Sequence, residues 1–337
     1  MGKLNVGVVG LGLGRHFSAA LAASDAVGRI AICDPDEQRA EQIRADIPAV
    51  AAMYPDLEEM LDRESLDAVC VVTPDHLHRP HAELCLRAGC HVLLTKPLAT
   101  NLEDGRAIVR AAEAAGRKLM VAHERRYRTH IRHIKAMLAA GDLGSVIHLR
   151  IDAIQDKRAQ FAASPWYASA EAGRTALVGS GIHEVDLLRH LIARPIESIS
   201  AYSNRLGDLD FPKDTTTAAL FRFEGGAIGQ VTVTYEAHWP EAGIIDDHFR
   251  LVGAKGLVVG LRAARDGREE WENIPRDRDP IVEGVRGCVN AFLDSILNDS
   301  PIPIDGRDAF ASLAACVAAD QSAATGQPIT PEPSDFA

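Results

Sequence analysis

The chain has 337 residues, a length that suits two compact domains, and its 47% hydrophobic and 25% charged residues are typical of a globular protein. The formal net charge of −11 argues against nucleic acid or an anionic membrane surface as a partner. Six scattered cysteines without C-x-x-C spacing, no signal-peptide pattern and no apolar run of membrane-spanning length predict a cytoplasmic protein without a membrane anchor.

Residues 4–16, with the sequence LNVGVVGLGLGRH, combine a short apolar run, a glycine-rich turn and the start of a helical pattern. The valines are typical of a buried parallel strand, and a helix is expected to begin near Arg15. Gly10 permits a tight turn, and Gly12 lets the backbone approach a pyrophosphate at the N-terminus of that helix. The spacing departs from G-x-G-x-x-G, because position 15 is arginine and a glycine stands one place earlier, at Gly14.

A second apolar run, residues 29–33, ends in Asp34, at about the spacing from the turn where an acidic residue binds the ribose 2′-hydroxyl of a dinucleotide. A carboxylate there would repel a 2′-phosphate, and residues 35–37 bring no positive charge, so NAD is favoured over NADP. Alternatively, Asp34 only caps a helix that begins near Pro35, and the two roles are compatible.

Strand and helix patterns alternate through about residue 125. Helices are expected over residues 36–45, 57–62, 80–88 and 102–115, and strands over residues 68–72, 91–94 and 118–122. The alternation predicts an α/β fold: a doubly wound parallel sheet, forming a Rossmann dinucleotide-binding domain of residues 1–125. Since ligands bind beyond the carboxyl ends of such strands, one crevice should be lined by Gly10, Asp34, Thr73, Thr95, Lys96, His123 and Glu124.

From residue 126 onward, strands follow one another instead. Helices are expected over about residues 131–138 and 181–192, and strands over residues 146–153, 196–203, 215–223, 227–235, 249–253 and 257–261. The Glu-Gly-Gly sequence at residues 224–226 is typical of a hairpin turn. We therefore expect an α+β domain over residues 126–330, with an open, mostly antiparallel sheet and two late helices over residues 281–297 and 308–325.

Several motifs together resemble the Gfo/Idh/MocA oxidoreductase family: the glycine turn, TPDHLH at residues 73–78, AGCHVLLTKPLA at 88–99, RRY at 125–127 and GIHEVD at 181–186. The likeness extends to the ending SAATGQPI at residues 322–329, so it covers nearly the whole chain. It implies a dehydrogenase that transfers a hydride between a nicotinamide and a secondary alcohol of a sugar, cyclitol or related polyol. It also implies that the second domain carries the substrate site and the contacts of a homodimer or homotetramer.

The resemblance assigns the catalytic roles to Lys96 and His183. Lys96 would polarise the reacting oxygen and stabilise alkoxide charge, and His183 would accept the alcohol proton as the general base. By itself, a lysine before a proline is usually a solvated loop residue, and a histidine at a helix start often only bonds the backbone. Asp186, one helical turn further on, either orients the imidazole or forms a structural salt bridge.

The remaining site residues follow from the same reasoning. The cofactor is expected to contact Gly10, Gly12, Leu13, Gly14, Asp34, Thr73, Pro74, His78, Thr95, Lys96 and Glu124. The substrate is expected to contact Lys96, Arg125, Trp166, His183 and Tyr235, with His238 as a weaker candidate. The histidines at 76, 78 and 81 have a spacing that suits zinc, but without a nearby fourth ligand we expect no metal.

The chain departs from the family pattern at three positions. Gly179 stands where an aspartate often shares the proton transfer, Thr95 replaces the usual glutamate before the lysine, and Glu124 replaces the usual asparagine before the arginine pair. The loss of the acid at Gly179 leaves three possibilities open. His183 acts alone, another acid (Glu184 or Asp156) fills the gap, or the substrate itself does.

These departures keep two alternatives open. One is a redox-neutral glycosidase or lyase that retains NAD and acts through a transient keto-sugar. The other is a catalytically silent NAD-binding sensor, which is disfavoured because Lys96 and His183 are both present.

Overall fold

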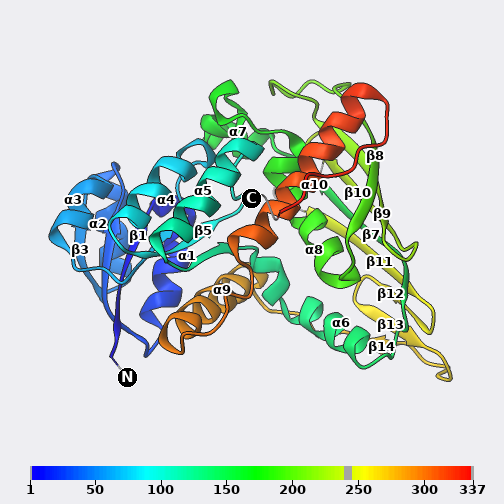
Figure 1. Ribbon diagram of the computed structural model, residues 1–337, viewed down its shortest axis with the longest axis horizontal. Helices are drawn as coiled ribbons and strands as arrows, with labels where there is room; N and C mark the ends of the chain where they lie inside the picture. Colours follow the sequence, from blue (N-terminus) through cyan, green and yellow to red (C-terminus); the bar gives the residue numbers. More distant parts are fainter. Residues whose placement is uncertain (1, 239–244, 335–337) are drawn as a thin grey trace. The chain divides into compact units, whose positions relative to one another are not determined.

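The computed structural model describes residues 2–238 and 245–334, and the chain divides into two compact units, each built on one sheet (Figure 1). The first unit comprises residues 1–127 and 281–310, and the second comprises residues 128–280 and 311–337. We predicted a single boundary after residue 125. In the structure the boundary lies two residues later, and the chain returns to the first unit for residues 281–310.

The first unit contains a six-stranded parallel sheet with the strand order β3-β2-β1-β4-β5-β6. The strands are β1 (Leu4–Val9), β2 (Val27–Cys33), β3 (Val50–Tyr54), β4 (Ala68–Val71), β5 (His91–Thr95) and β6 (Leu119–Ala122). The helices between them are α1 (Leu11–Ala22), α2 (Glu37–Asp46), α3 (Leu57–Arg63), α4 (His78–Arg87) and α5 (Leu102–Ala115). The predicted doubly wound Rossmann sheet is confirmed. The edge strand β3 was not predicted, because its short, alanine-containing sequence has little strand propensity.

A helix from late in the chain completes the core of the first unit. Helix α9 (Pro280–Leu297) buries Val285, Val289 and Phe292 in the same apolar cluster as Val6 and Val8 of β1. We predicted that this helix completes the second domain. It packs in the first unit instead, because its apolar stripe covers alternate residues of the parallel sheet.

The second unit contains an eight-stranded sheet with the order β14-β13-β12-β11-β7-β10-β9-β8. Its strands are β7 (Val146–Gln155), β8 (Ile196–Asn204), β9 (Thr216–Phe223), β10 (Ile228–Thr234), β11 (Ile245–Gly253), β12 (Gly256–Val259), β13 (Arg262–Arg265) and β14 (Glu272–Asn273). The pair β7–β10 is parallel and the other pairs are antiparallel, so the predicted mostly antiparallel sheet is confirmed. The expected hairpin at residues 224–226 joins β9 to β10.

Helices cover one face of this sheet. The unit includes α6 (Thr129–Ala139), α7 (Arg158–Ala163), α8 (Ile182–Ile192) and, from Ala311, most of α10 (Gly306–Thr325). Helix α8 packs on β7 and β10. On the other face Tyr202, Leu220 and Ile228 are exposed. Across residues 2–238 and 245–334, the helices are too short or too polar to cross a bilayer.

Candidate active site

The turn after β1 is shaped by three glycines with different tasks. Gly10 has a φ of 85°, and a Cβ there would lie 2.6 Å from the Val72 carbonyl oxygen, so only glycine fits. A Cβ on Gly14 would lie 3.2 Å from Val8, so Gly14 allows the close helix–strand contact that the third glycine of the fingerprint provides. At Gly12 a Cβ would meet none of the described residues within 4 Å. This open space at the N-terminus of α1 fits a dinucleotide phosphate.

Helix α1 begins at Leu11, four residues earlier than predicted, and Asp34 binds its first amide. The Asp34 carboxylate accepts hydrogen bonds from Leu11 N at 2.7 Å and Asp36 N at 3.0 Å. Asp36, and not Asp34, caps α2, since its side chain accepts from Arg39 N. The interpretation of Asp34 as a mere cap of α2 is therefore wrong: Asp34 is held at the end of the glycine turn.

Arg39 is a site residue that sequence reasoning missed. Its guanidinium lies 3.2 Å from Asp34 and 3.0 Å from Asp36. Helical spacing could have identified Arg39, because the first turn of α2 brings residue 39 back to the end of β2. Positive charge is thus present beside the expected ribose position, although both neighbouring carboxylates bind it.

A buried histidine ties together the loops that follow β4 and β5. The ring of His78 is fully buried, with Nδ1 2.8 Å from Pro97 O and Nε2 3.0 Å from Thr73 O. The His81 ring lies 3.1 Å from the Thr73 hydroxyl, and burial lowers the pKa of His81. These contacts support the loop of Lys96, which precedes a cis proline. Within residues 2–238 and 245–334, no three or more histidine, cysteine, aspartate or glutamate side chains are arranged so that they could hold a metal ion.

The segment after β6 is supported by α9. The short 3₁₀ helix Glu124–Tyr127 buries Arg125. A Cβ on Gly284 would lie 2.8 Å from Glu124 O, and a Cβ on Gly287 would lie 2.5 Å from Tyr127. Two glycines of α9 therefore let the helix approach this segment closely, and they place Glu124 and Arg125 after the last strand of the sheet.

In the second unit His183 lies in the first turn of α8 and is 9% exposed. A π-helical turn, Leu177–Gly181, runs directly into α8. Asp186 accepts a hydrogen bond from Ser312 Oγ at 3.0 Å, and Arg189 donates to the same hydroxyl at 2.7 Å. These contacts join α8 to α10.

The space beside Gly179 is filled by Arg174, a residue that the sequence analysis did not name. Arg174 Nη2 donates to Gly179 O at 2.6 Å. A Cβ on Gly179 would lie 2.6 Å from Arg174 Nε and 2.9 Å from the Tyr235 hydroxyl. The sequence feature that could have identified Arg174 is its position, five residues before Gly179 in the same motif.

Trp166 and Tyr235, both predicted substrate contacts, lie around this arginine. The Trp166 ring stacks on Tyr167 with centroids 3.9 Å apart, and the Arg174 guanidinium lies over both rings. Tyr235 is buried, and its hydroxyl is 3.1 Å from Ser180 Oγ. The second unit thus gathers two aromatic residues, a guanidinium and the helix that carries His183.

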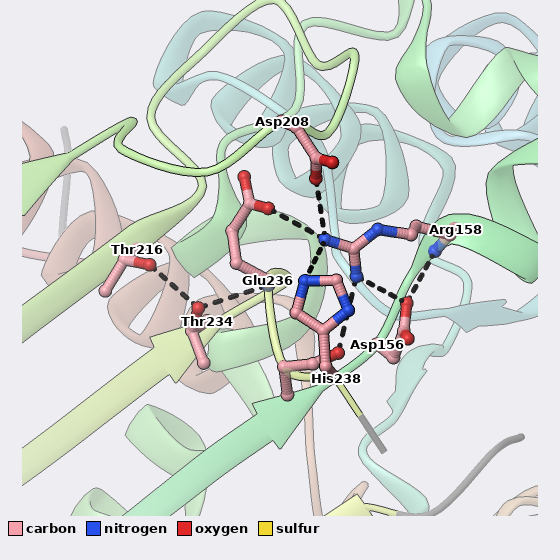
Figure 2. A network of polar contacts seen from close by, with 8 residues as sticks. Asp156, Arg158, Asp208, Thr216, Thr234, Glu236 and His238 are labelled. Atoms are coloured by element: carbon pink, nitrogen blue, oxygen red, sulfur yellow. Dashed lines mark hydrogen bonds and ion pairs between the residues drawn. The ribbon is translucent and has the colours of Figure 1, made fainter. Parts of the chain in front are cut away.

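His238 and Asp156 belong to a different cluster. Figure 2 shows the Asp156, Asp208 and Glu236 carboxylates and the His238 ring around the Arg158 guanidinium. The shortest contact joins Arg158 to Asp208 at 2.8 Å, and this hydrogen bond lowers the pKa of Asp208. Asp156 therefore binds Arg158, whereas Arg174 fills the space at Gly179.

The parallel sheet, its glycine turn and the acidic residue after β2 define a dinucleotide-binding protein with a second, sheet-based domain. Residues 4–123 match the family model described as oxidoreductase family, NAD-binding Rossmann fold, and residues 131–259 match the GFO/IDH/MocA C-terminal domain. The chain belongs to the Gfo/Idh/MocA oxidoreductase family, as the motifs predicted.

Individual relatives agree with this assignment. The chain is 31% identical to 1-carboxy-3-chloro-3,4-dihydroxycyclo hexa-1,5-diene dehydrogenase of Comamonas testosteroni, over 70% of this chain and 59% of that protein. It is 27% identical to inositol 2-dehydrogenase 2 of Saccharopolyspora erythraea, over 99% of this chain and 98% of the relative. The WlbA dehydrogenase of Bordetella pertussis, solved with NADH and UDP-GlcNAcA, superimposes with a TM-score of 0.83 at 27% identity and covers 98% of this chain and 99% of its own.

These comparisons confirm the predicted nicotinamide cofactor, because the family has an NAD-binding Rossmann fold and the WlbA structure holds NADH. The relatives named here are dehydrogenases. They give the redox-neutral glycosidase or lyase no support.

Proposed function

We propose that the protein is an NAD-dependent dehydrogenase of a secondary alcohol in a sugar, cyclitol or related polyol. The observation that carries the proposal is the position of Lys96, directly after β5, at the sheet edge that also holds the glycine turn and Asp34. The inositol dehydrogenase relative supports the substrate class.

The first unit would bind the cofactor, and the second would bind the substrate and form the oligomer contact. Cofactor contacts are assigned to Gly10, Gly12, Leu13, Gly14, Asp34, Thr73, Pro74, Thr95, Lys96 and Glu124. His78, predicted as a further contact, is fully buried against Thr73 O and Pro97 O and supports the two loops instead. The fit of a dinucleotide to this turn is supported by the open space at Gly12 and by the tight backbone turn at Gly10, where a Cβ would not fit. When bound, NAD supplies the hydride acceptor.

The chain's own residues would hold the alcohol and move its proton. The Lys96 ammonium donates a hydrogen bond to the reacting oxygen and stabilises the negative charge that develops there. The His183 imidazole accepts the hydroxyl proton. Arg125, Trp166 and Tyr235 would contact the rest of the substrate.

Replacing Lys96 by alanine tests the proposal. Loss of one such hydrogen-bond donor typically costs about 10²–10³-fold in kcat, so Lys96→Ala should form NADH at a rate at least this much lower on any substrate that the wild type oxidises. Calorimetry should show that the variant still binds NAD, because the other assigned cofactor contacts remain. Lys255→Ala, on an exposed turn of the second unit, is the control. Undiminished turnover by Lys96→Ala would refute the assignment.

We also infer a homodimer or homotetramer in the cytoplasm. Tyr202 is 80% exposed, and with Leu220 and Ile228 it places apolar area on the open face of the sheet. The six cysteines are buried thiols, as suits a reducing compartment. Light scattering should give two or four times the chain mass of 36.3 kDa, and Tyr202→Glu with Leu220→Glu should lower it.

A further inference from the structure

The segment before α8 presents a buried positive charge near His183. Arg174 follows Gly173, whose φ of 64° turns the chain, and it is only 6% exposed. Its guanidinium carbon lies 4.7 Å from the ring centre of Tyr167 and 5.4 Å from that of Trp166. A guanidinium packed on two rings and bonded to Gly179 O has a defined orientation.

The chain around Arg174 is built to admit the guanidinium. Any side chain at Gly179 would begin 2.6 Å from Nε and 2.8 Å from Nη2. Gly179 and His183 are four residues apart in one continuous helical stretch, so they lie about one turn apart on the same side. The guanidinium therefore contacts this helical stretch about one turn before His183.

We propose that the substrate carries a carboxylate and that Arg174 binds it. This inference rests on the proposed function, because His183 marks the end of the substrate that reacts. A guanidinium has only hydrogen-bond donors, in a planar fork that matches the two oxygens of a carboxylate. Polar attraction is stronger in a site shielded from water than at the surface. The geometry thus favours a hydroxy acid, such as an aldonate, uronate or cyclitol carboxylate, over the neutral polyol.

A panel of matched pairs tests the proposal on the full chain loaded with NAD. Each pair is an aldonate or uronate and the alditol or aldose of the same configuration, and NADH formation gives kcat/KM. A site that hydrogen-bonds a substrate group strongly rejects the analogue that lacks it, so we expect the acid to exceed its neutral partner by about 10²-fold or more. Equal or better turnover of the neutral partners would overturn the proposal.

Arginine variants identify the residue responsible. In Arg174→Gln, the preference for the acid should fall by about 10²-fold, mainly through KM, while Arg174→Lys keeps the charge and should recover part of it. Arg262→Gln is the matched control, because Arg262 also stacks on a tryptophan of the second unit but lies exposed in β13. An acid preference that is the same in Arg174→Gln and wild type would also overturn the proposal.

Calorimetric titration of the NADH-loaded protein with the same acids separates this inference from the proposed reaction. If the acids bind in a way that depends on Arg174 but form no NADH from NAD, the proposal of a carboxylate site is supported and the proposed dehydrogenase activity is refuted. Oxidation of the acids and of their neutral partners with equal kcat/KM, in wild type and in Arg174→Gln alike, would keep the dehydrogenase and remove the carboxylate site. Acids that bind wild type no more tightly than their neutral partners contradict the inference even if the variants fail to fold.

Discussion

The sheet edge of the first unit and the helix start of the second unit are built differently. At the sheet edge, the candidate contacts come from backbone geometry and from residues adjacent to strands: Gly10 turns the chain, and Asp34 binds the first amide of α1. At the helix start, the side chain of Arg174 is held by ring stacking and by its hydrogen bond to Gly179 O. Contacts that the backbone makes can be predicted from a sequence motif, whereas contacts that depend on side-chain packing cannot.

The largest expected effect tests the helix start. His183→Ala should lower kcat by about 10²–10⁴-fold, because a positioned general base typically contributes that much. Stopped-flow measurement of NADH formation checks this, and added imidazole should restore part of the rate. His130→Ala on α6 serves as the control. Turnover near the wild-type rate would show that proton transfer does not depend on the second unit.

Substitutions at two glycines of the turn should have different effects, one on the stability of the fold and the other on cofactor binding. Gly10→Ala needs a positive φ and meets a backbone carbonyl, so it should lower the free energy of unfolding by roughly 2–4 kcal/mol, visible as a lower Tm. Gly12→Ala meets none of the described residues, so its Tm without cofactor should stay near that of wild type while NAD affinity falls. Equal effects of the two variants on both readouts would contradict the assigned roles.

Asp34 should set the preference for NAD over NADP. Asp34→Ser removes the charge that repels a 2′-phosphate and releases Arg39 from its contact at 3.2 Å. Hydrogen bonds to charged groups contribute about 1.5–3 kcal/mol, so the NADP to NAD ratio of kcat/KM should rise by about 10²-fold. Asp46→Ser, at the exposed end of α2, is the control. An unchanged ratio would place the ribose elsewhere.

The smallest effect concerns pH. Burial raises the pKa of Asp320 from 3.8 to about 6, so the folded state holds its proton more tightly than the unfolded state. Stability is lost as the pH rises from about 4 to 6, by about 1–3 kcal/mol. Asp320→Asn can still accept the Thr175 hydrogen bond and should raise Tm at pH 8 but not at pH 4. An equal gain at both pH values would contradict this origin.

Much of the fold was predictable because its signals are local. The strands β4 and β5 contain runs of consecutive apolar residues, and α5 begins after its capping Asn101 and ends at Gly116. Helix α9 shows the limit. Its apolar stripe identifies a buried helix, but the pattern is the same whichever sheet it covers, so its place in the first unit was not predictable.

The amino-acid sequence by itself determined the family, the parallel sheet, the nicotinamide cofactor and the candidate residues Lys96 and His183, because strand ends and glycine turns are encoded by neighbouring residues. Only the tertiary structure decided what fills the space at Gly179 and which charge lies beside Asp34. The physical reason is that a long arginine side chain reaches several ångströms from its backbone. Its charge therefore acts where packing holds the guanidinium, and not where the residue stands in the chain.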